Sequence, residues 1–300
     1  MNFAKRILTF VLVNLLVVAT ISIVLNVLGV RPYLTANGID YNSLAIFCLV
    51  WGMGGAFISL ALSRVLAKWT MGVQVIKSPA NPDEAWLVGK VHEIARRANL
   101  DVMPEVGVYR SPDPNAFATG PTKNRSLVAV STGLMEQLDK NSVEGVLAHE
   151  VAHIANGDMV TMTLVQGVVN AFVMFFARII AFAISQNVKE ESRPLVNMLT
   201  TIVLEIAFSF LAMFVVAYVS RHREFRADAG AANLSGRDKM VAALESLQRF
   251  VARPSHQDEE NAQPALAAFK ISGKSSSFLS LLSTHPPLAV RIERLKTGAY

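Results

Sequence analysis

The sequence is poor in cysteine and in charged residues. Cys48 is the only cysteine among 300 residues, and it lies inside a long apolar run. A single cysteine excludes an intrachain disulfide framework and a cysteine-based zinc cluster, which leaves a reducing compartment open. Charged residues make up 17% of the chain and aromatic residues 8%, whereas 52% of the residues are hydrophobic. Because this excess sits in a few long runs of Val, Ile, Leu, Ala and Phe, it does not describe one large water-soluble core.

The net charge of +5 raises the question of nucleic-acid binding. The sequence contains no recognition module and no interleaving of aromatic with basic residues, so we expect no nucleic-acid partner. Lys and Arg instead flank the apolar runs, where basic residues set the orientation of membrane helices. The charge pattern therefore favours a membrane protein in contact with the lipid bilayer.

Four apolar runs are each about long enough to cross a membrane as a helix. They are Ile7 to Val30, Tyr41 to Leu66, Met159 to Ile184 and Leu195 to Ser220. The first run follows Lys5 and Arg6, as the core of a signal peptide would. It is too long for that role, however, and no small-residue cleavage site follows it. We therefore expect four transmembrane helices, with the first one retained as an anchor.

Four crossings would place the amino terminus and both long polar segments on one side of the membrane. These segments are basic, whereas the two short connecting loops are nearly neutral, so the positive-inside rule makes that side cytoplasmic. The expected order is two N-terminal transmembrane helices (1–67), a first soluble segment (68–158), a helical hairpin (159–220) and a second soluble segment (221–300). The two soluble segments can then assemble into one cytoplasmic domain.

The apolar runs contain a few residues that predict how the helices meet. Arg178 and Glu205 lie about equally far from the tip of the hairpin, so they can meet at a similar depth. Intramembrane charges usually face a partner or water, and we interpret these two as a structural ion pair rather than as catalytic residues. In the second run, Gly52, Gly54 and Gly55 would let another helix approach closely.

The first soluble segment is predicted to contain helices and short strands. A helix begins at Pro82, and apolar residues recur after it at helical spacing. Short strands are predicted at Glu105 to Arg110, Ala116 to Thr119 and Leu127 to Ser131. Asn141 then opens a second helix, with Glu144 placed three residues later for a capping box, and this helix ends at Asn156–Gly157.

The second helix carries the pattern His149-Glu150-Val151-Ala152-His153. Positions four apart share one face of a helix, so both imidazoles can bind one metal ion. Imidazole nitrogen suits zinc, and two such ligands leave room for a third ligand and a water. Glu150 is turned about 100° from His149, which places it beside the metal, where it can take a proton from an activated water. Two surface histidines that bind nothing are the alternative, which the capped helix after candidate strands disfavours.

A zinc site of this kind needs a third protein ligand, and no third histidine follows closely. Glu224 is the candidate, because it comes directly after the fourth apolar run, which returns the chain to the side of His149 and His153. Asp228 lies one helical turn further on and can hold a ligand histidine by its second nitrogen. Alternatively, Glu224 belongs to a solvated charge cluster with the arginines around it, and spacing alone does not decide between the two.

The two leading apolar runs, the HEVAH helix, the apolar hairpin and the EFRAD segment together resemble the bacterial heat-shock membrane proteases of the M48 family of zinc metallopeptidases. The likeness covers essentially the whole chain. It implies one zinc ion per chain, held by His149, His153 and Glu224, with Asp228 behind the ligands. It also implies an α-helical membrane protein with four transmembrane helices and an α+β, gluzincin-like zincin domain.

The same resemblance implies a function. Such enzymes are endopeptidases of the bacterial inner membrane with an active site that faces the cytoplasm. They cleave misfolded or damaged membrane proteins during stress, and they often cleave themselves. We accordingly expect this chain to hydrolyse unfolded or membrane-protein polypeptides, with Glu150 as the general base.

The segment Asn115-Ala116-Phe117-Ala118 resembles an edge strand that lies beside the zinc in this family. An edge strand has unpaired backbone groups, so it can bind a peptide as an added strand. Recognition would then depend on the backbone of the substrate more than on its sequence. An ordinary turn and strand is the alternative.

His285 and Arg291 resemble a carboxyl-terminal element of the family. His285 can donate a hydrogen bond to the oxyanion that forms during peptide hydrolysis. Arg291 can brace a carboxylate of the site. A histidine flanked by proline is more often structural, so both interpretations of His285 stay open.

Three other functions fit parts of the pattern. A catalytically silent membrane chaperone or scaffold of the same fold would not need Glu150. A metal-handling membrane protein would need its histidines inside an apolar span, whereas His149 and His153 precede the third run. Specificity for prenylated carboxyl termini, as in the related CAAX prenyl peptidases, would need a membrane chamber built from more anchors than this chain has.

Overall fold

The computed structural model describes residues 19–21, 23, 25–27, 34–35, 38–252 and 283–298 of the chain. The chain forms two compact units. The helical unit consists of Met1–Leu60 and Thr161–Val216, and the sheet unit consists of Ala61–Val160 and Ala217–Tyr300. Three long helices contribute residues to both units.

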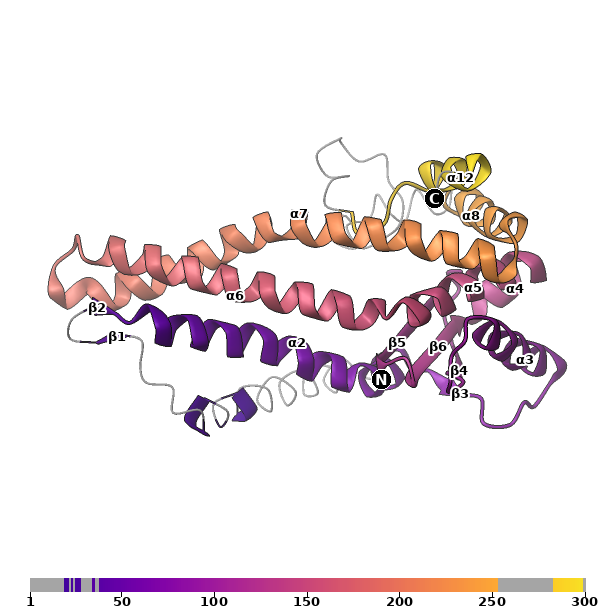
Figure 1. Cartoon of the computed structure of the whole chain (residues 1–300), viewed down its shortest axis with the longest axis horizontal. Coiled ribbons are helices and arrows are strands. Elements are labelled where there is room, and N and C mark those ends of the chain that lie inside the picture. Colours follow the sequence, from indigo (N-terminus) through magenta and orange to yellow (C-terminus); the bar gives the residue numbers. More distant parts are fainter. Residues whose placement is uncertain are drawn as a thin grey trace. The chain divides into compact units, whose positions relative to one another are not determined.

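Three helices of the described residues are long and apolar enough to cross a membrane. They are α2 (Tyr41–Met71), α6 (Asp158–Ser185) and α7 (Arg193–Ser235), with the 3-10 turn η1 (Glu190–Ser192) before α7 (Figure 1). They correspond to the second, third and fourth predicted crossings. Most of the first predicted run, Ile7 to Val30, lies outside the described residues, so the fourth crossing stays a prediction. The expected polar loop before α2 contains a short hairpin of β1 (Leu34–Thr35) and β2 (Gly38–Ile39).

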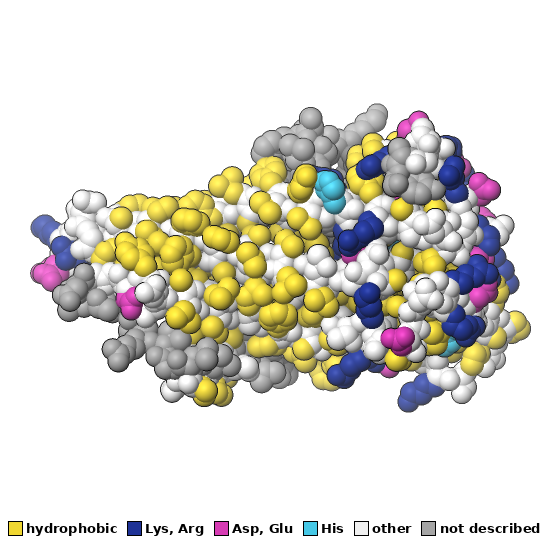
Figure 2. All heavy atoms as spheres, in the orientation of Figure 1, with side chains coloured by type: hydrophobic (Ala, Val, Ile, Leu, Met, Phe, Trp, Pro, Cys, Tyr) yellow, Lys and Arg dark blue, Asp and Glu magenta, His cyan; other side chains and the backbone are white. Residues whose placement is uncertain are grey.

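These helices leave most of their apolar surface open. In the most apolar stretch of each candidate span, only a few residues are buried. The buried share is 17% in α2 and in α6, and 6% in Glu190–Ser235, which comprises η1 and α7. Hydrophobic side chains cover most of the visible face of these helices (Figure 2). Phe57, Phe172 and Ile206 are among the exposed hydrophobic residues of the three helices. Because contiguous apolar surface of this extent is unfavourable in water, the helical unit requires an apolar surrounding.

Inside the helical unit, α2 and α6 approach each other closely at a glycine. A Cβ atom at Gly52 would lie 2.6 Å from the backbone nitrogen of Ala171 and 2.7 Å from the carbonyl oxygen of Gly167. The expected close approach is therefore confirmed at Gly52. At Gly55, by contrast, no described residue lies within 4 Å of the position of an added Cβ.

The charges of the two hairpin helices form the predicted ion pair. The Nη1 atom of Arg178 lies 2.5 Å from Oε1 of Glu205. The Arg178 guanidinium also lies 5.5 Å from the centre of the Phe47 ring of α2. Since the charge inside each apolar run of the hairpin lies against the opposite charge of the other run, the pair links α6 to α7.

The sheet unit is built on a four-stranded sheet with the strand order β3-β4-β6-β5. The strands are β3 (Gln74–Val75), β4 (Glu105–Tyr109), β5 (Ala116–Thr122) and β6 (Arg125–Ser131). β4 and β6 are parallel, and the other neighbours are antiparallel. The three predicted strands are confirmed with small shifts at their ends, while β3 is too short to show an alternating pattern. β5 lies at the edge of the sheet, as expected.

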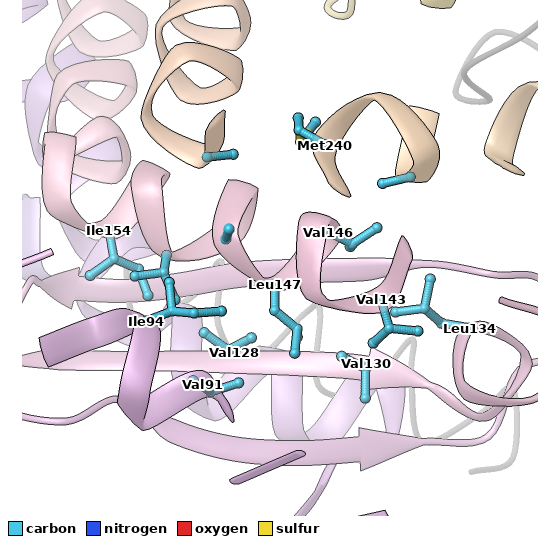
Figure 3. Packing of buried hydrophobic residues seen from close by; sticks show 14 of the residues in the cluster. Val91, Ile94, Val128, Val130, Leu134, Val143, Val146, Leu147, Ile154 and Met240 are labelled. Carbon is cyan, nitrogen blue, oxygen red and sulfur yellow. The ribbon is translucent and has the colours of Figure 1, made fainter. Parts of the chain in front are cut away.

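Helices cover both faces of this sheet. α3 (Pro82–Arg97) and α5 (Lys140–Asn156) pack on one face, where Leu147 of α5 points towards Val128 of β6 (Figure 3). Alternate side chains of a strand point to opposite faces. Leu127 and its neighbours therefore form a second cluster on the other face, packed against Ala67 in the last turns of α2.

Further helices cover the side of α5 that faces away from the sheet. The short helix α4 (Thr132–Gln137) connects β6 to α5. α8 (Arg237–Val251) packs on α5 through Met240, near Val146 (Figure 3), and α12 (Leu288–Thr297) packs on α8. A Cβ atom at Gly145 would lie 2.4 Å from the carbonyl oxygen of Lys239, so glycine is needed where α8 approaches α5. α5 is therefore a fully packed helix, which suits it to hold side chains in fixed positions.

The start of α5 differs from the prediction. Asp139 is the N-cap residue, and its Oδ1 atom accepts hydrogen bonds from the backbone nitrogens of Asn141 (2.9 Å) and Ser142 (3.0 Å). The predicted capping box of Asn141 and Glu144 is wrong, because Glu144 is buried and its carboxylate pairs with Lys239 of α8 at 2.8 Å. The predicted end of the helix at Asn156 is confirmed.

Candidate metal centre

His149 and His153 lie on consecutive turns of α5 and face each other. Their Nε2 atoms are 3.0 Å apart, and their side chains are only 9% and 11% exposed. Residues four apart share one face of a helix, so this convergence follows from their spacing. Since the rest of α5 is packed into the core, the two rings have little freedom to turn away.

Glu224 reaches the same point from α7. Its Oε2 atom lies 3.3 Å from Nε2 of His149, and its Oε1 atom lies 3.4 Å from Nε2 of His153. The carboxylate is completely buried. The ligand atoms of these three residues all lie within 4.8 Å of one another. The structure therefore brings together the three residues that the sequence analysis proposes as metal ligands.

The geometry of these atoms fits a bound zinc ion. Two ligand atoms that share one tetrahedral zinc ion are about 3.3 Å apart, given the usual bond lengths. The three separations in this cluster are 3.0, 3.3 and 3.4 Å. Oε2 of Glu224 is buried and, among the described residues, accepts no hydrogen bond of good geometry. Two imidazoles and one carboxylate are also a donor set that zinc enzymes use with an open fourth position.

An aspartate and an arginine hold the outer nitrogen of His149. Oδ1 of Asp228 lies 3.0 Å from Nδ1 of His149, and Arg291 of α12 donates two hydrogen bonds to the same carboxylate, at 2.6 and 2.8 Å. Burial alone would lower the pKa of His149, but its hydrogen bonds to Asp228 and Glu224 raise that pKa to about 9. Both residues therefore lie where the sequence analysis expects them, behind the ligands.

A second aspartate holds the outer nitrogen of His153, and the sequence analysis misses it. Oδ2 of Asp158 lies 2.6 Å from Nδ1 of His153, and Arg226 of α7 donates to the other oxygen of Asp158. Asp158 directly follows Gly157, whose φ of 72° and ψ of 29° form the left-handed cap of α5. That conformation favours glycine. An acidic residue immediately after the glycine that ends the histidine helix is the signal that could have identified Asp158.

Glu150 lies between the two histidines in sequence and is half-buried. It is not among the residues whose ligand atoms converge in the described part of the chain. Burial lowers the pKa of Arg291, but Asp228, then Glu224 and more weakly Glu150 raise it, so that the net shift is upward. Glu150 is therefore a neighbour of the cluster rather than one of its three converging ligands.

His285 also reaches the cluster. Its Nδ1 atom lies 3.0 Å from Oε2 of Glu224, and its side chain is 36% exposed. The turn that carries it is held to α7, because Arg221 donates to the carbonyl oxygen of Ser283 at 3.1 Å. The Ser283 hydroxyl in turn donates to the carbonyl oxygen of His285 at 2.8 Å. The structure therefore places His285 against a candidate ligand and within reach of solvent.

The segment Asn115 to Ala118 forms the start of the edge strand β5. The backbone nitrogen of Ser131 donates to the carbonyl oxygen of Asn115 at 2.8 Å, and the backbone nitrogen of Asn115 donates to the Ser131 hydroxyl at 2.9 Å. Beyond β5, Lys123 donates to the carbonyl oxygen of Ala155 in the last turn of α5. This contact ties the β5–β6 turn to the helix that carries both histidines.

Comparisons with known proteins give a consistent result. Residues 81–299 match the family model described as Peptidase family M48. A protein of Bacillus licheniformis named "Protease HtpX homolog" is 53% identical over 300 residues, which cover 97% of this chain and 99% of that protein. One of the same name in Bacillus subtilis is 54% identical over 301 residues, covering 98% of this chain and 99% of that protein. The crystal structure of S. mikatae Ste24p has a similar fold, with a TM-score of 0.61 at 17% identity, over 97% of this chain and 66% of that one.

Proposed function

We propose that this chain, which belongs to peptidase family M48, is a zinc-dependent endopeptidase. Its family, its relatives and its ligand cluster support a membrane metallopeptidase. The observation that carries this proposal is the convergence of His149, His153 and Glu224. Two helices far apart in the sequence bring these three buried side chains to one point. No hydrophobic packing requirement accounts for two imidazoles and a carboxylate at such a point.

His149, His153 and Glu224 would hold the zinc ion. When bound, zinc supplies Lewis-acid chemistry, because it polarises a substrate carbonyl and lowers the pKa of water. With zinc bound, Asp228 would accept from Nδ1 of His149, and Nε2 would offer its lone pair to the metal. These contacts hold the ligands ready, so little reorganisation is needed when the ion binds.

Glu150 acts in this proposal as the general base and then as the general acid. Its half-buried position allows contact with a water molecule that also lies next to the ligand cluster. The carboxylate takes a proton from that water as the water oxygen attacks the peptide carbonyl carbon. It then gives the proton to the amide nitrogen of the leaving peptide, which breaks the carbon–nitrogen bond.

The edge strand β5 offers a backbone surface for the substrate. Pairs along an antiparallel ladder alternate between hydrogen-bonded and non-hydrogen-bonded. Because Asn115 bonds to Ser131, Phe117 and Thr119 also direct their backbone groups to β6. The N–H and C=O groups of Ala116 and Ala118 therefore point to the free edge. We propose that an extended substrate pairs with these two residues, so that its sequence matters little.

The free edge ends shortly after these residues. The register of β5 shifts between Thr119 and Thr122, where Gly120 and Pro121 lie. Proline has no backbone N–H to offer a partner strand. The substrate strand is therefore expected to be short, and to leave β5 where the bulge begins.

We retain the interpretation that His285 donates to the developing oxyanion. Its Nδ1 atom contacts Glu224, so the donation would come from Nε2 of this partly exposed side chain. Arg291 acts indirectly, by bracing Asp228 behind His149. Both residues would help to position charge rather than bind metal.

The apolar helices support a proposal for the cellular setting. We propose a multi-pass protein of the bacterial inner membrane whose catalytic domain faces the cytoplasm. Basic residues flank the apolar helices and support that orientation. Recognition through backbone groups suits misfolded or damaged membrane proteins as substrates during stress, and it also allows self-cleavage. A metal-handling role is disfavoured, because α5 is not among the three candidate spans.

The test uses the full chain purified in detergent. Glu150→Gln is expected to retain one zinc ion per chain, measured by elemental analysis, and to lose cleavage of casein and of itself. Glu136→Gln, at an exposed carboxylate on α4, is the matched control and is expected to keep full activity. If Glu150→Gln binds zinc and cleaves casein like the wild type, the general-base assignment fails. Wild-type protein that binds zinc but cleaves nothing would support the silent chaperone instead.

A further inference from the structure

The two candidate ligand histidines are held in the same way on their outer sides. Nδ1 of His149 contacts Asp228, which is held by Arg291. Nδ1 of His153 contacts Asp158, which is held by Arg226. The proposed function uses the first aspartate–arginine pair and leaves the second without a role.

Asp158 is buried and has two charged or polar partners. Its side chain is 1% exposed, and its Oδ2 atom lies 2.6 Å from Nδ1 of His153. The left-handed glycine cap at Gly157 ends α5 directly before Asp158, whose carboxylate contacts a side chain five residues earlier. A carboxylate in this position accepts the Nδ1 proton, which fixes the ring orientation and leaves Nε2 able to bind a metal.

Arg226 connects this aspartate to the third ligand. It lies two residues after Glu224 on α7, and it donates to the oxygen of Asp158 that does not contact His153. The same stretch of α7 therefore supplies Glu224 to one side of His153 and holds Asp158 on the other. Asp158 is also the first residue of α6, one of the candidate membrane spans. The contacts of Asp158 therefore connect the start of α6 and a side chain of α7 to a histidine near the end of α5.

The exposed fractions of Arg226 and Asp158 indicate where the loss of their ion pair should have its effect. The Arg226 side chain is 55% exposed, and an ion pair between two exposed groups contributes little. Its partner, however, is a buried carboxylate, and removing the arginine leaves that charge without its cation. The effect of losing Arg226 should therefore appear at His153 rather than at the surface.

We propose that Asp158 and Arg226 are positioning residues that orient His153 for zinc binding and set how fast zinc leaves. This inference rests on the proposed zinc site. Asp158 fixes the ring, and Arg226 fixes Asp158 relative to Glu224. Zinc retention then depends on the junction between α5 and α6 as well as on the three ligands.

The experiment compares zinc release from full-length variants in detergent, followed with a chelating dye, and the visible spectrum of the Co²⁺-substituted proteins. Asp158→Asn is expected to weaken zinc binding roughly 10- to 100-fold, the usual effect of losing a group behind a ligand. Arg226→Gln is expected to act in the same direction and less strongly, and Arg226→Lys to restore most of the loss. A change in the Co²⁺ spectrum of Asp158→Asn would report a moved ligand, which a merely structural role would not produce.

Two control variants are measured in the same way. Asp228→Asn should weaken zinc binding as a positive control. Glu245→Gln removes a partly exposed pair with Lys296 (2.8 Å) and should leave zinc release unchanged.

Arg226→Gln, at a half-exposed side chain, keeps the test valid if Asp158→Asn does not fold. Zinc affinity within twofold of wild type in both Asp158→Asn and Arg226→Gln, with Asp228→Asn impaired, would overturn the inference and leave the proposed function standing. Wild-type protein without zinc affinity would end both.

Discussion

The ring of His285 contacts the carboxylate of Glu224, with 3.0 Å between Nδ1 and Oε2. This relationship connects the carboxyl-terminal turn to the third candidate ligand. It leaves two roles for His285, because a ring in this place can steady Glu224 or can donate to the oxyanion. The two roles predict different losses when the ring is removed.

We expect His285→Ala to retain zinc and to lower kcat for casein cleavage by about 100-fold, with a small change in KM. Loss of one oxyanion donor typically has an effect of this size. Zinc content and steady-state kinetics of the same preparation make the measurement. A variant that keeps kcat per bound zinc but loses the ion would show that His285 acts by holding Glu224.

Zinc affinity should fall as the pH falls. In the metal-free protein the pKa of His149 is raised to about 9, so the ring carries a proton at neutral pH. Zinc must displace that proton, since only neutral imidazole is a ligand. The protonation of His149 alone should therefore lower the apparent affinity for zinc by about tenfold for each pH unit below 9. Competition with a chelator of known pH dependence, between pH 6.5 and 9, gives the slope, and a flat profile would contradict the prediction.

The chemistry of the centre could be predicted from the sequence because it depends on local spacing. Histidines four apart must share a helix face, so the convergence of His149 and His153 needed no tertiary information. Glu224 was different. Spacing left it undecided between a ligand and a solvated charge, and only the family resemblance favoured the ligand. In the structure its side chain is completely buried against both rings.

The rest could not be predicted, because tertiary contacts decided it. Asn141 and Glu144 have the correct types and spacing for a capping box, yet α5 begins earlier, at the cap made by Asp139. The approach of α8 buries Glu144 and pairs it with Lys239, which no local pattern reveals. Asp158 was likewise missed, because its contact with His153 depends on the turn at the glycine cap and on an arginine from α7.

Proline scanning of β5 tests the predicted register of the substrate. The N–H group of Ala118 points away from β6, so Ala118→Pro should keep the sheet and remove one bond to the substrate. We expect KM for casein to rise severalfold, with the thermal transition nearly unchanged. Phe117→Pro is the matched control. It removes a ladder bond to β6 and should destabilise the fold by about 1 to 3 kcal/mol. Equal destabilisation by the two prolines would show that the register is wrong.

Gly52 provides a test of the helical unit that is independent of the metal centre. A Cβ at this position would lie 2.6 Å from the backbone nitrogen of Ala171, which is closer than a real Cβ can approach. Gly52→Ala must therefore push α2 and α6 apart, and we expect a loss of about 1 to 3 kcal/mol in the free energy of unfolding. Unfolding in mixed detergent and SDS micelles measures it. Gly55→Ala is the control, since no described residue lies within 4 Å of its added Cβ, and it should not lower the stability. A similar loss at both positions would contradict the prediction, because the close contact exists only at Gly52. Helix propensity alone would stabilise both variants, since alanine favours a helix more than glycine does. The contact at Gly52 must therefore outweigh that gain for the variant to be destabilised at all.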